Sequence, residues 1–133
     1  MLPRAARLKR NRDFKAVYAQ RRSYSIGPLV LYVRLRRDRP VDVDVAKVSV
    51  EGVRPACRIG FVISKKVAKR SHDRNRLKRR LREICRHQVL PRLRKNVVVD
   101  MMIVSRPGAT ELEFARLAAD VETLGRQAGL FAQ

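Results

Sequence analysis

Residues 97–105, Val-Val-Val-Asp-Met-Met-Ile-Val-Ser, are the stretch of sequence that decides the fold. The run is almost entirely apolar and consists mainly of β-branched residues and methionine. A strand buried on one face alternates apolar and polar residues, whereas a strand covered on both faces does not. The run therefore predicts the central strand of a sheet.

The residues after this strand predict a C-terminal helix. Residues 106–108, Arg-Pro-Gly, indicate a turn, and Thr110 with Glu113 fits a capping box for the first backbone amides of a helix. Apolar residues then recur at helical spacing: Phe114, Leu117, Ala118, Val121, Leu124 and Ala128. We expect this helix to pack on the sheet.

Before the central strand, a second strand leads into a long basic helix. Residues 58–64 alternate, with one apolar face made of Ile59, Phe61 and Ile63. Ser71 is a candidate N-cap for a helix that runs to about Leu90, where Pro91 discourages continuation. The apolar stripe of this helix consists of Leu77, Leu81, Ile84, Cys85 and Val89.

The first residues predict a basic arm followed by a short helix. Residues 1–10 are basic and lack the apolar stretch of a secretory signal, so we interpret them as an arm. Phe14, Val17 and Tyr18 then recur at i, i+3 and i+4, with Asn11 as a candidate N-cap. This pattern predicts an amphipathic helix over residues 11–20.

Residues 29–35 alternate as a strand does, with one face toward the core and Tyr32 on the other. We expect a loop over residues 21–28. Residues 38–55 contain Asp42, Asp44 and Glu51 among alternating valines, and we interpret them as an acidic insertion between strands, either an extended hairpin or a mobile segment.

The predicted order is therefore α-β-β-α-β-α, with the insertion between the first two strands. A chain of 133 residues with 45% apolar residues can bury one core. We expect a single α+β domain over residues 1–133, with helices packed on a small mixed sheet.

The charge of the chain points to a polyanionic partner. Thirty-two Lys and Arg against 12 Asp and Glu give a formal net charge of +20. Such a field attracts phosphate backbones and destabilises the compact state until it is neutralised. The chain has no long apolar span and no Trp, so nucleic acid is favoured over a membrane. Two cysteines, Cys57 and Cys85, form no disulfide framework or metal motif, which favours the cytoplasm.

The positive charge is densest around the start of the long helix. Only Asp73 opposes ten basic residues between positions 65 and 82: Lys65, Lys66, Lys69, Arg70, Arg74, Arg76, Lys78, Arg79, Arg80 and Arg82. Runs of charge on helices are usually solvated surface, but ten like charges repel one another without a ligand. Guanidinium groups bind phosphate oxygens in pairs, and Asn75 can read a base edge or a 2′-hydroxyl.

The sequence offers no constellation for nuclease chemistry by the protein itself. His72 and His87 lie roughly 22 Å apart if both are helical, so they cannot act on one phosphate. The acidic pair Asp42 and Asp44 is interpreted as solubilising. We therefore predict no catalytic residue and no metal site in the protein.

Two segments make a resemblance specific. Arg58-Ile-Gly-Phe-Val-Ile-Ser-Lys-Lys66, followed by Arg74-Asn-Arg-Leu-Lys-Arg-Arg-Leu-Arg-Glu83, resembles the bacterial ribonuclease P protein family, which carries an R-N-R-x-K-R box after a strand ending in S-K-K. Residues 8–18 and 97–107 resemble that family's first helix and last strand. Residues 67–73 and the insertion depart from its usual pattern.

The resemblance implies a fold like that of ribosomal protein S5 domain 2 and a role as subunit of ribonuclease P. It implies that the catalytic RNA, in a 1:1 complex, contacts Arg70, Arg74, Asn75, Arg76, Lys78, Arg79 and Arg82. It further implies that the 5′ leader of precursor tRNA contacts Phe14, Tyr18, Tyr32, Lys65 and Lys66. The chemistry would belong to the RNA and its Mg²⁺ ions, with no cofactor bound by the protein alone.

Two other classes of protein have the size and the charge of this chain. A ribosomal protein or RNA chaperone would bind structured RNA without association with a cleaving RNA. A DNA-binding helix module would need a helix-turn-helix pair, whereas strands flank the basic helix here. No membrane and no small-molecule substrate is expected.

Overall fold

Strand β4 (Val99–Ser105) lies inside a four-stranded sheet, as its apolar run predicts. The computed structural model describes residues 7–8, 10–20, 22–35, 57–93 and 99–131. The strand order is β1-β2-β4-β3. Strand β2 (Leu29–Leu35) pairs antiparallel with β4, and β3 (Cys57–Ile63) pairs parallel with it. The sheet is therefore mixed, and the prediction of a small mixed sheet is confirmed.

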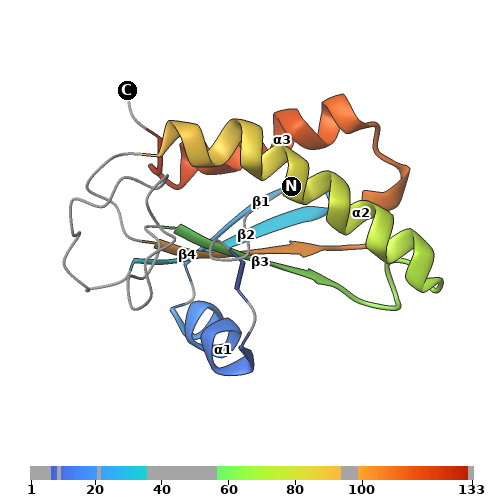
Figure 1. Cartoon of the computed structure of the whole chain (residues 1–133), viewed down its shortest axis with the longest axis horizontal. Helices are drawn as coiled ribbons and strands as arrows, with labels where there is room; N and C mark the ends of the chain where they lie inside the picture. Colours follow the sequence, from blue (N-terminus) through green and yellow to red (C-terminus); the bar gives the residue numbers. More distant parts are fainter. Residues whose placement is uncertain (1–6, 9, 21, 36–56, 94–98, 132–133) are drawn as a thin grey trace.

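The helices cover both faces of this sheet (Figure 1). Helix α1 (Asn11–Ala19) lies on one face, and α2 (Ser71–Ile84) and α3 (Phe114–Gln127) lie side by side on the other. The α+β class is confirmed, with three layers. Among the described residues, no helix combines the length and apolar character needed to cross a bilayer.

The largest core lies between the sheet and the pair α2 and α3. The predicted stripe of α2 is buried in it: Leu77, Leu81, Ile84, Cys85 and Val89. The helix changes to π geometry in η3 (Cys85–Val89) and to a 3₁₀ turn in η4 (Leu90–Arg92), so it ends near Pro91 as expected. The stripe of α3 is buried from Leu117 to Ala128, but its first member, Phe114, remains 46% exposed.

The loop predicted over residues 21–28 is wrong in part, because Ser23–Ile26 form strand β1. Strand β1 pairs antiparallel with β2 across a turn at Gly27 and Pro28, where Gly27 has a φ of 53°. A strand of four residues is too short to show a clear alternation of apolar and polar side chains. Its place in the sheet depends on backbone hydrogen bonds to β2 and not on a pattern of side chains. The pairing makes this segment a hairpin.

The predicted helix caps are also wrong. The N-cap residues are Arg10, Arg70 and Glu113, and none of them makes a side-chain capping hydrogen bond. Asn11 and Ser71 are instead the first residues of their helices, so their side chains are past the capping position. Thr110 lies in the 3₁₀ turn η5 (Ala109–Glu111), which separates it from α3.

Residues 7 and 8 extend the sheet beyond β3. Arg7 forms a parallel bridge with Ile59, and the Leu8 amide donates to the Ile59 carbonyl at 2.9 Å. Leu8 is buried. The rest of the predicted arm up to residue 6, the insertion at 38–55 and residues 97–98 lie outside the described residues, so the predictions there stand untested.

Candidate nucleic-acid interface

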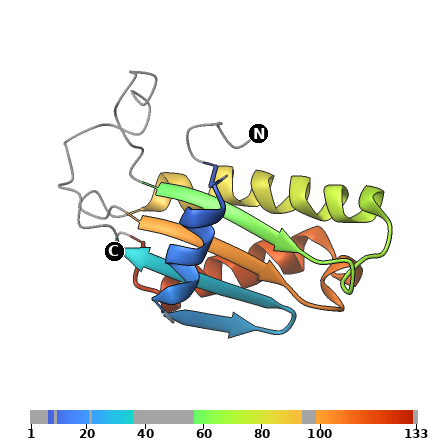
Figure 2. The same ribbon diagram turned by 90° about the horizontal axis from the view of Figure 1, so that it is seen from below.

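Three rows of side chains cross the face of the sheet beneath α1. The strand registers align them as Arg34–Asp100–Arg58, Tyr32–Met102–Gly60 and Val30–Val104–Val62. We call these the ionic row, the aromatic row and the valine row. Figure 2 shows that α1 lies across the strands and leaves the C-terminal ends of β3 and β4 uncovered.

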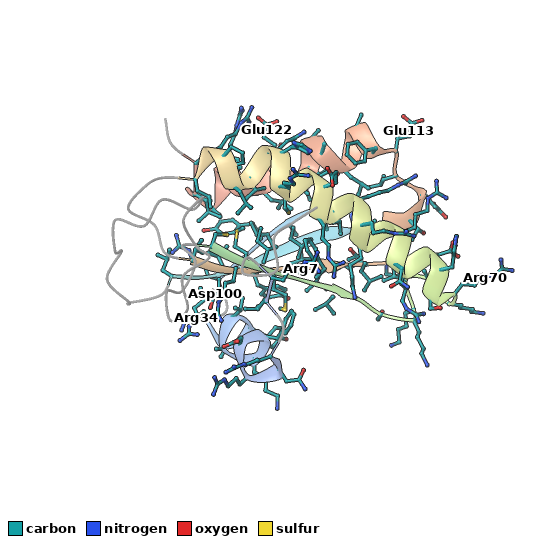
Figure 3. All side chains as sticks on the ribbon, viewed as in Figure 1. Arg7, Arg34, Arg70, Asp100, Glu113 and Glu122 are labelled. Atoms are coloured by element: carbon teal, nitrogen blue, oxygen red, sulfur yellow. The ribbon has the colours of Figure 1, made fainter. Side chains whose placement is uncertain are left out.

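The ionic row holds α1 in place. Arg58 donates to both carboxylate oxygens of Asp100, at 2.9 and 2.7 Å, and reaches Asp13 of α1 at 3.4 Å. The Asp100 side chain is fully buried. Its hydrogen bonds raise the pKa of Arg58 above the ordinary value. Figure 3 labels Asp100 and Arg34 on the side of the sheet that faces α1. No pattern in the sequence indicates this network, because it depends on the order of the strands in the sheet.

The aromatic row lies directly under α1. A Cβ on Gly60 would collide with the Phe14 ring, so glycine allows that ring to lie on β3. Val17 is buried against Met102. At the other end of the row the rings of Tyr18 and Tyr32 lie 5.3 Å apart at 43°. Tyr18 is 61% exposed and Tyr32 is half-buried, so this pair presents an aromatic surface to solvent.

The valine row continues this surface toward a basic turn. Val62 is exposed and Val104 is half-buried. Lys65 and Lys66 follow β3 in a turn closed by a 3.0 Å hydrogen bond from the Val67 amide to the Ser64 carbonyl, and both lysines are exposed. Of the five residues predicted for the leader, Phe14, Tyr18 and Tyr32 lie on the α1 side of the sheet, and Lys65 and Lys66 lie in the turn after β3.

Most of the residues predicted for the catalytic RNA lie on α2, and Arg70 is the N-cap that precedes it. Helical spacing places Asn75, Lys78, Arg79 and Arg82 on one stripe, away from the buried leucines. Arg70, Asn75, Arg76 and Arg79 are exposed, and Arg74, Lys78 and Arg82 are half-buried. Of the six basic residues within α2, Arg76 and Arg79 are exposed and the other four are half-buried.

Two of these residues have structural contacts that the sequence did not reveal. Arg74 donates to the carbonyls of Ala68 and Lys69, at 2.9 and 3.0 Å, and so ties the connection between β3 and α2 to the helix. Burial, together with the nearby charge of Arg7, lowers the pKa of Arg82. Arg82, Lys78 and Arg7 line a hollow of about 250 Å³ at the edge of β3.

The histidines take part in no shared site. His87 lies 2.9 Å from Glu83, and His72 lies 3.6 Å from Asp73, one helix turn or less away in each case. Across the part of the chain that the structure describes, no three His, Cys, Asp or Glu side chains are placed to hold a metal ion.

Comparison with known proteins identifies the family. The sequence profile described as Ribonuclease P matches residues 2–129. The chain belongs to the ribonuclease P protein family. It is 38% identical over 124 residues to the ribonuclease P protein component of Cyanothece sp., covering 93% of this chain and 92% of that protein. The corresponding protein of Synechocystis sp. is 30% identical over 129 residues, covering 97% and 90%.

Solved structures show the same fold at lower identity. The ribonuclease P protein of Staphylococcus aureus matches with a TM-score of 0.72 at 21% identity, covering 96% of this chain and 98% of that one. The Thermotoga maritima protein matches with a TM-score of 0.67 at 22% identity, covering 90% and 96%.

The family membership confirms the role expected from the two motifs. The chain is an RNA-binding protein subunit of ribonuclease P, an endoribonuclease, and functions in maturation of the tRNA 5′ end. As a subunit of that enzyme it associates with ribonuclease P RNA. The readings as a ribosomal protein, an RNA chaperone or a DNA-binding module are set aside.

Proposed function

We propose that this subunit binds two RNA partners through two separate surfaces. The outer side of α2 binds the catalytic RNA, in a 1:1 complex, through Arg70, Arg74, Asn75, Arg76, Lys78, Arg79 and Arg82. The opposite side of the sheet binds the 5′ leader of precursor tRNA through Phe14, Tyr18, Tyr32, Lys65 and Lys66.

The observation that carries this proposal is that α1, which holds Phe14 and Tyr18, and α2 lie on opposite faces of one sheet (Figure 1). Helix α2 presents a dense, solvated array of guanidinium groups, which suits a folded RNA backbone. The Tyr18–Tyr32 pair, the valine row and the lysines form a surface with exposed rings and apolar side chains. Unpaired bases stack on such surfaces, and a single-stranded leader has unpaired bases.

The two surfaces meet at the connection between β3 and α2. Lys65 and Lys66 end the leader surface, and Arg70 begins the basic helix, with Arg74 bonded to the intervening backbone. An RNA held on α2 and a leader held on the sheet are thereby fixed relative to one another. Such positioning is the contribution we assign to the protein.

The hydrolysis itself is assigned to the catalytic RNA and its Mg²⁺ ions. The described residues offer no convergent carboxylates or histidines for metal binding or proton transfer, which supports this assignment. The protein needs no cofactor of its own in this proposal, and the proposed location is the cytoplasm.

Reconstitution tests the proposal directly. The purified protein alone should leave precursor tRNA uncut, and addition of ribonuclease P RNA should give cleavage at a lower Mg²⁺ concentration than the RNA needs alone. Arg74→Ala with Arg76→Ala should weaken assembly, and Tyr32→Ala should weaken only the binding of precursor tRNA. Cleavage by the protein after stringent removal of RNA would contradict the assignment.

A further inference from the structure

A hollow between α2 and the start of α3 shares Arg79 and Arg82 with the proposed catalytic-RNA surface, but its other lining residues have no role assigned above. It has a volume of about 320 Å³ and is lined by Arg79, Arg80, Arg82, Glu83 and Phe114. This volume is near the lower end of the range for small-ligand pockets, roughly 300 to 1,000 Å³. Figure 3 labels Glu113, the residue before Phe114, at the start of α3.

Phe114 is the unusual member of this lining. It belongs to the apolar stripe of α3 by spacing, yet it is 46% exposed, while Leu117, Val121 and Leu124 of the same stripe are buried. Phe114 is not part of the buried core cluster, and it lines the hollow instead. An aromatic ring with an open surface is a stacking platform for a planar ligand.

The charges around the ring indicate what kind of ligand this is. Three arginines surround the hollow, so a ligand that carries a phosphate relieves their mutual repulsion. Glu83 also lines it, and a hydrogen bond from His87 lowers the pKa of Glu83, so this carboxylate is ionised at neutral pH. Glu83 already pairs with His87 and Arg86, at 2.9 and 3.7 Å, and its carboxylate can also accept a hydrogen bond from the amino group of a nucleobase.

We propose that this hollow binds one unpaired nucleotide of the RNA that lies on α2, with its base stacked on Phe114 and its phosphate held by Arg79 and Arg80. The inference rests on the proposed binding of the catalytic RNA to α2. The stacked base adds one apolar contact to an interface that otherwise consists of charged contacts.

The alternative is that Phe114 merely packs beside arginine stems at the surface. The two readings differ in what a ring-deleting substitution does. Loss of a base-stacking contact costs about 1 to 3 kcal/mol, which corresponds to roughly a 5- to 150-fold loss of affinity. Loss of a surface packing contact leaves RNA affinity unchanged.

Three full-length variants separate these readings in equilibrium binding to ribonuclease P RNA. Phe114→Leu should weaken binding by about tenfold, and Phe114→Trp, which keeps a ring, should bind within about twofold of the wild type. Gln127→Ala, an exposed site in the last turn of α3, is the matched control and should bind as the wild type. Since Phe114 is half exposed, all three variants should keep the thermal midpoint of the wild type.

Chemical probing of the RNA in the complex supplies a second readout. Protection of one unpaired nucleotide should disappear in the Phe114→Leu complex and persist in the Gln127→Ala complex. It should already be present without precursor tRNA, which assigns the nucleotide to the catalytic RNA. Protection that appears only when precursor tRNA is added would overturn that assignment.

The Arg74→Ala, Arg76→Ala double variant separates failure of this inference from failure of the proposed function. If the double variant binds RNA weakly while Phe114→Leu binds normally, α2 remains the interface and the nucleotide pocket is rejected. If neither variant weakens binding, both the interface and the pocket are rejected.

Discussion

Arg58 shows how a single side chain fixes the position of a helix. Its guanidinium group holds Asp100 on the central strand and reaches Asp13 on α1, so it joins two strands and a helix. The Phe14 ring on Gly60 and the Tyr18–Tyr32 pair lie further along the same helix. The position of the proposed leader surface therefore depends on this ion pair.

Asp100→Asn tests that dependence. The variant removes the negative charge that pairs with the mostly buried Arg58 and leaves only an amide oxygen as acceptor at that position, and breaking a buried ion pair costs about 3 kcal/mol. We expect denaturant unfolding to show a loss of that size. Glu111→Gln, at an exposed site in η5, should change stability by no more than about 0.5 kcal/mol. Equal stability of Asp100→Asn and wild type would show that the Arg58–Asp100 pair does not hold α1 in position.

Tyr18 and Tyr32 should act as one unit on the leader. Tyr32→Ala is expected to weaken precursor tRNA binding about tenfold, since a base-stacking contact is worth about 1 to 3 kcal/mol, and to leave mature tRNA binding unchanged. Because the two rings contact each other, the double variant should lose less than the sum of the single losses. Strict additivity, or equal losses for both tRNAs, would argue against a shared platform.

At the scale of elements, the sequence predicted those whose side chains carry a strong pattern. The apolar run of β4, the alternation in β2 and β3 and the stripes of α2 and α3 each follow from burial, and each is confirmed. Strand β1 has only four residues and its pairing depends on backbone bonds to β2, so no pattern marked it. The predicted caps at Asn11 and Ser71 are wrong because a shift of one residue in the start of a helix moves the capping side chain away from the amides it would bond.

The candidate site was predictable to a similar extent and for the same reason. The basic residues of α2 form a dense local run, so their common location could be read from the chain. Contacts between distant segments could not, because they depend on register: the row that aligns Tyr32 with Gly60 exists only once β4 separates β2 from β3. The exposure of Phe114 likewise does not follow from its spacing in the apolar stripe of α3.

Arg74 has a double role in α2 that Arg76 does not share. Arg74 bonds two carbonyls of the preceding connection, whereas Arg76 is exposed. Arg74→Ala should therefore weaken RNA binding and also lower the free energy of unfolding by about 1 kcal/mol, while Arg76→Ala should weaken RNA binding alone. Binding and denaturant unfolding of both single variants check this. An unchanged stability of Arg74→Ala would mean that its contacts to Ala68 and Lys69 contribute nothing.

Cys85, where α2 passes into η3, reports on the packing of this helix. Burial raises the pKa of its thiol to about 12, so the folded state keeps the proton that the unfolded chain releases near pH 9. Its contribution to stability is present below about pH 9 and is lost as the pH rises toward 12. The stability difference between wild type and Cys85→Ala should narrow by about 2 kcal/mol from pH 8 to pH 11. A pH-independent difference would indicate a solvated thiol.

At the scale of the whole molecule, the net charge and the layered arrangement of helices and sheet have different roles in RNA binding. The net charge of +20 attracts the protein to any RNA, and in the proposed arrangement each face of the sheet binds a different RNA. An electrostatic interface on α2 releases counterions when it binds. The logarithm of RNA affinity should then fall linearly with the logarithm of salt concentration, by about 0.7 to 0.9 for each phosphate neutralised.

The slope of this line distinguishes the phosphate contacts proposed for Arg74 and Arg76 from the base-stacking contact proposed for Phe114. Arg74→Ala with Arg76→Ala removes up to two phosphate contacts, so the slope should become shallower by up to about 1.4 to 1.8 units. Phe114→Leu removes an uncharged ring, so its line should be displaced to weaker binding and remain parallel to that of the wild type. Titrations at four or five salt concentrations give both slopes. A slope unchanged in the double arginine variant would contradict phosphate binding by the start of α2, whereas a shallower slope in Phe114→Leu would show that the ring acts only by placing its neighbouring arginines.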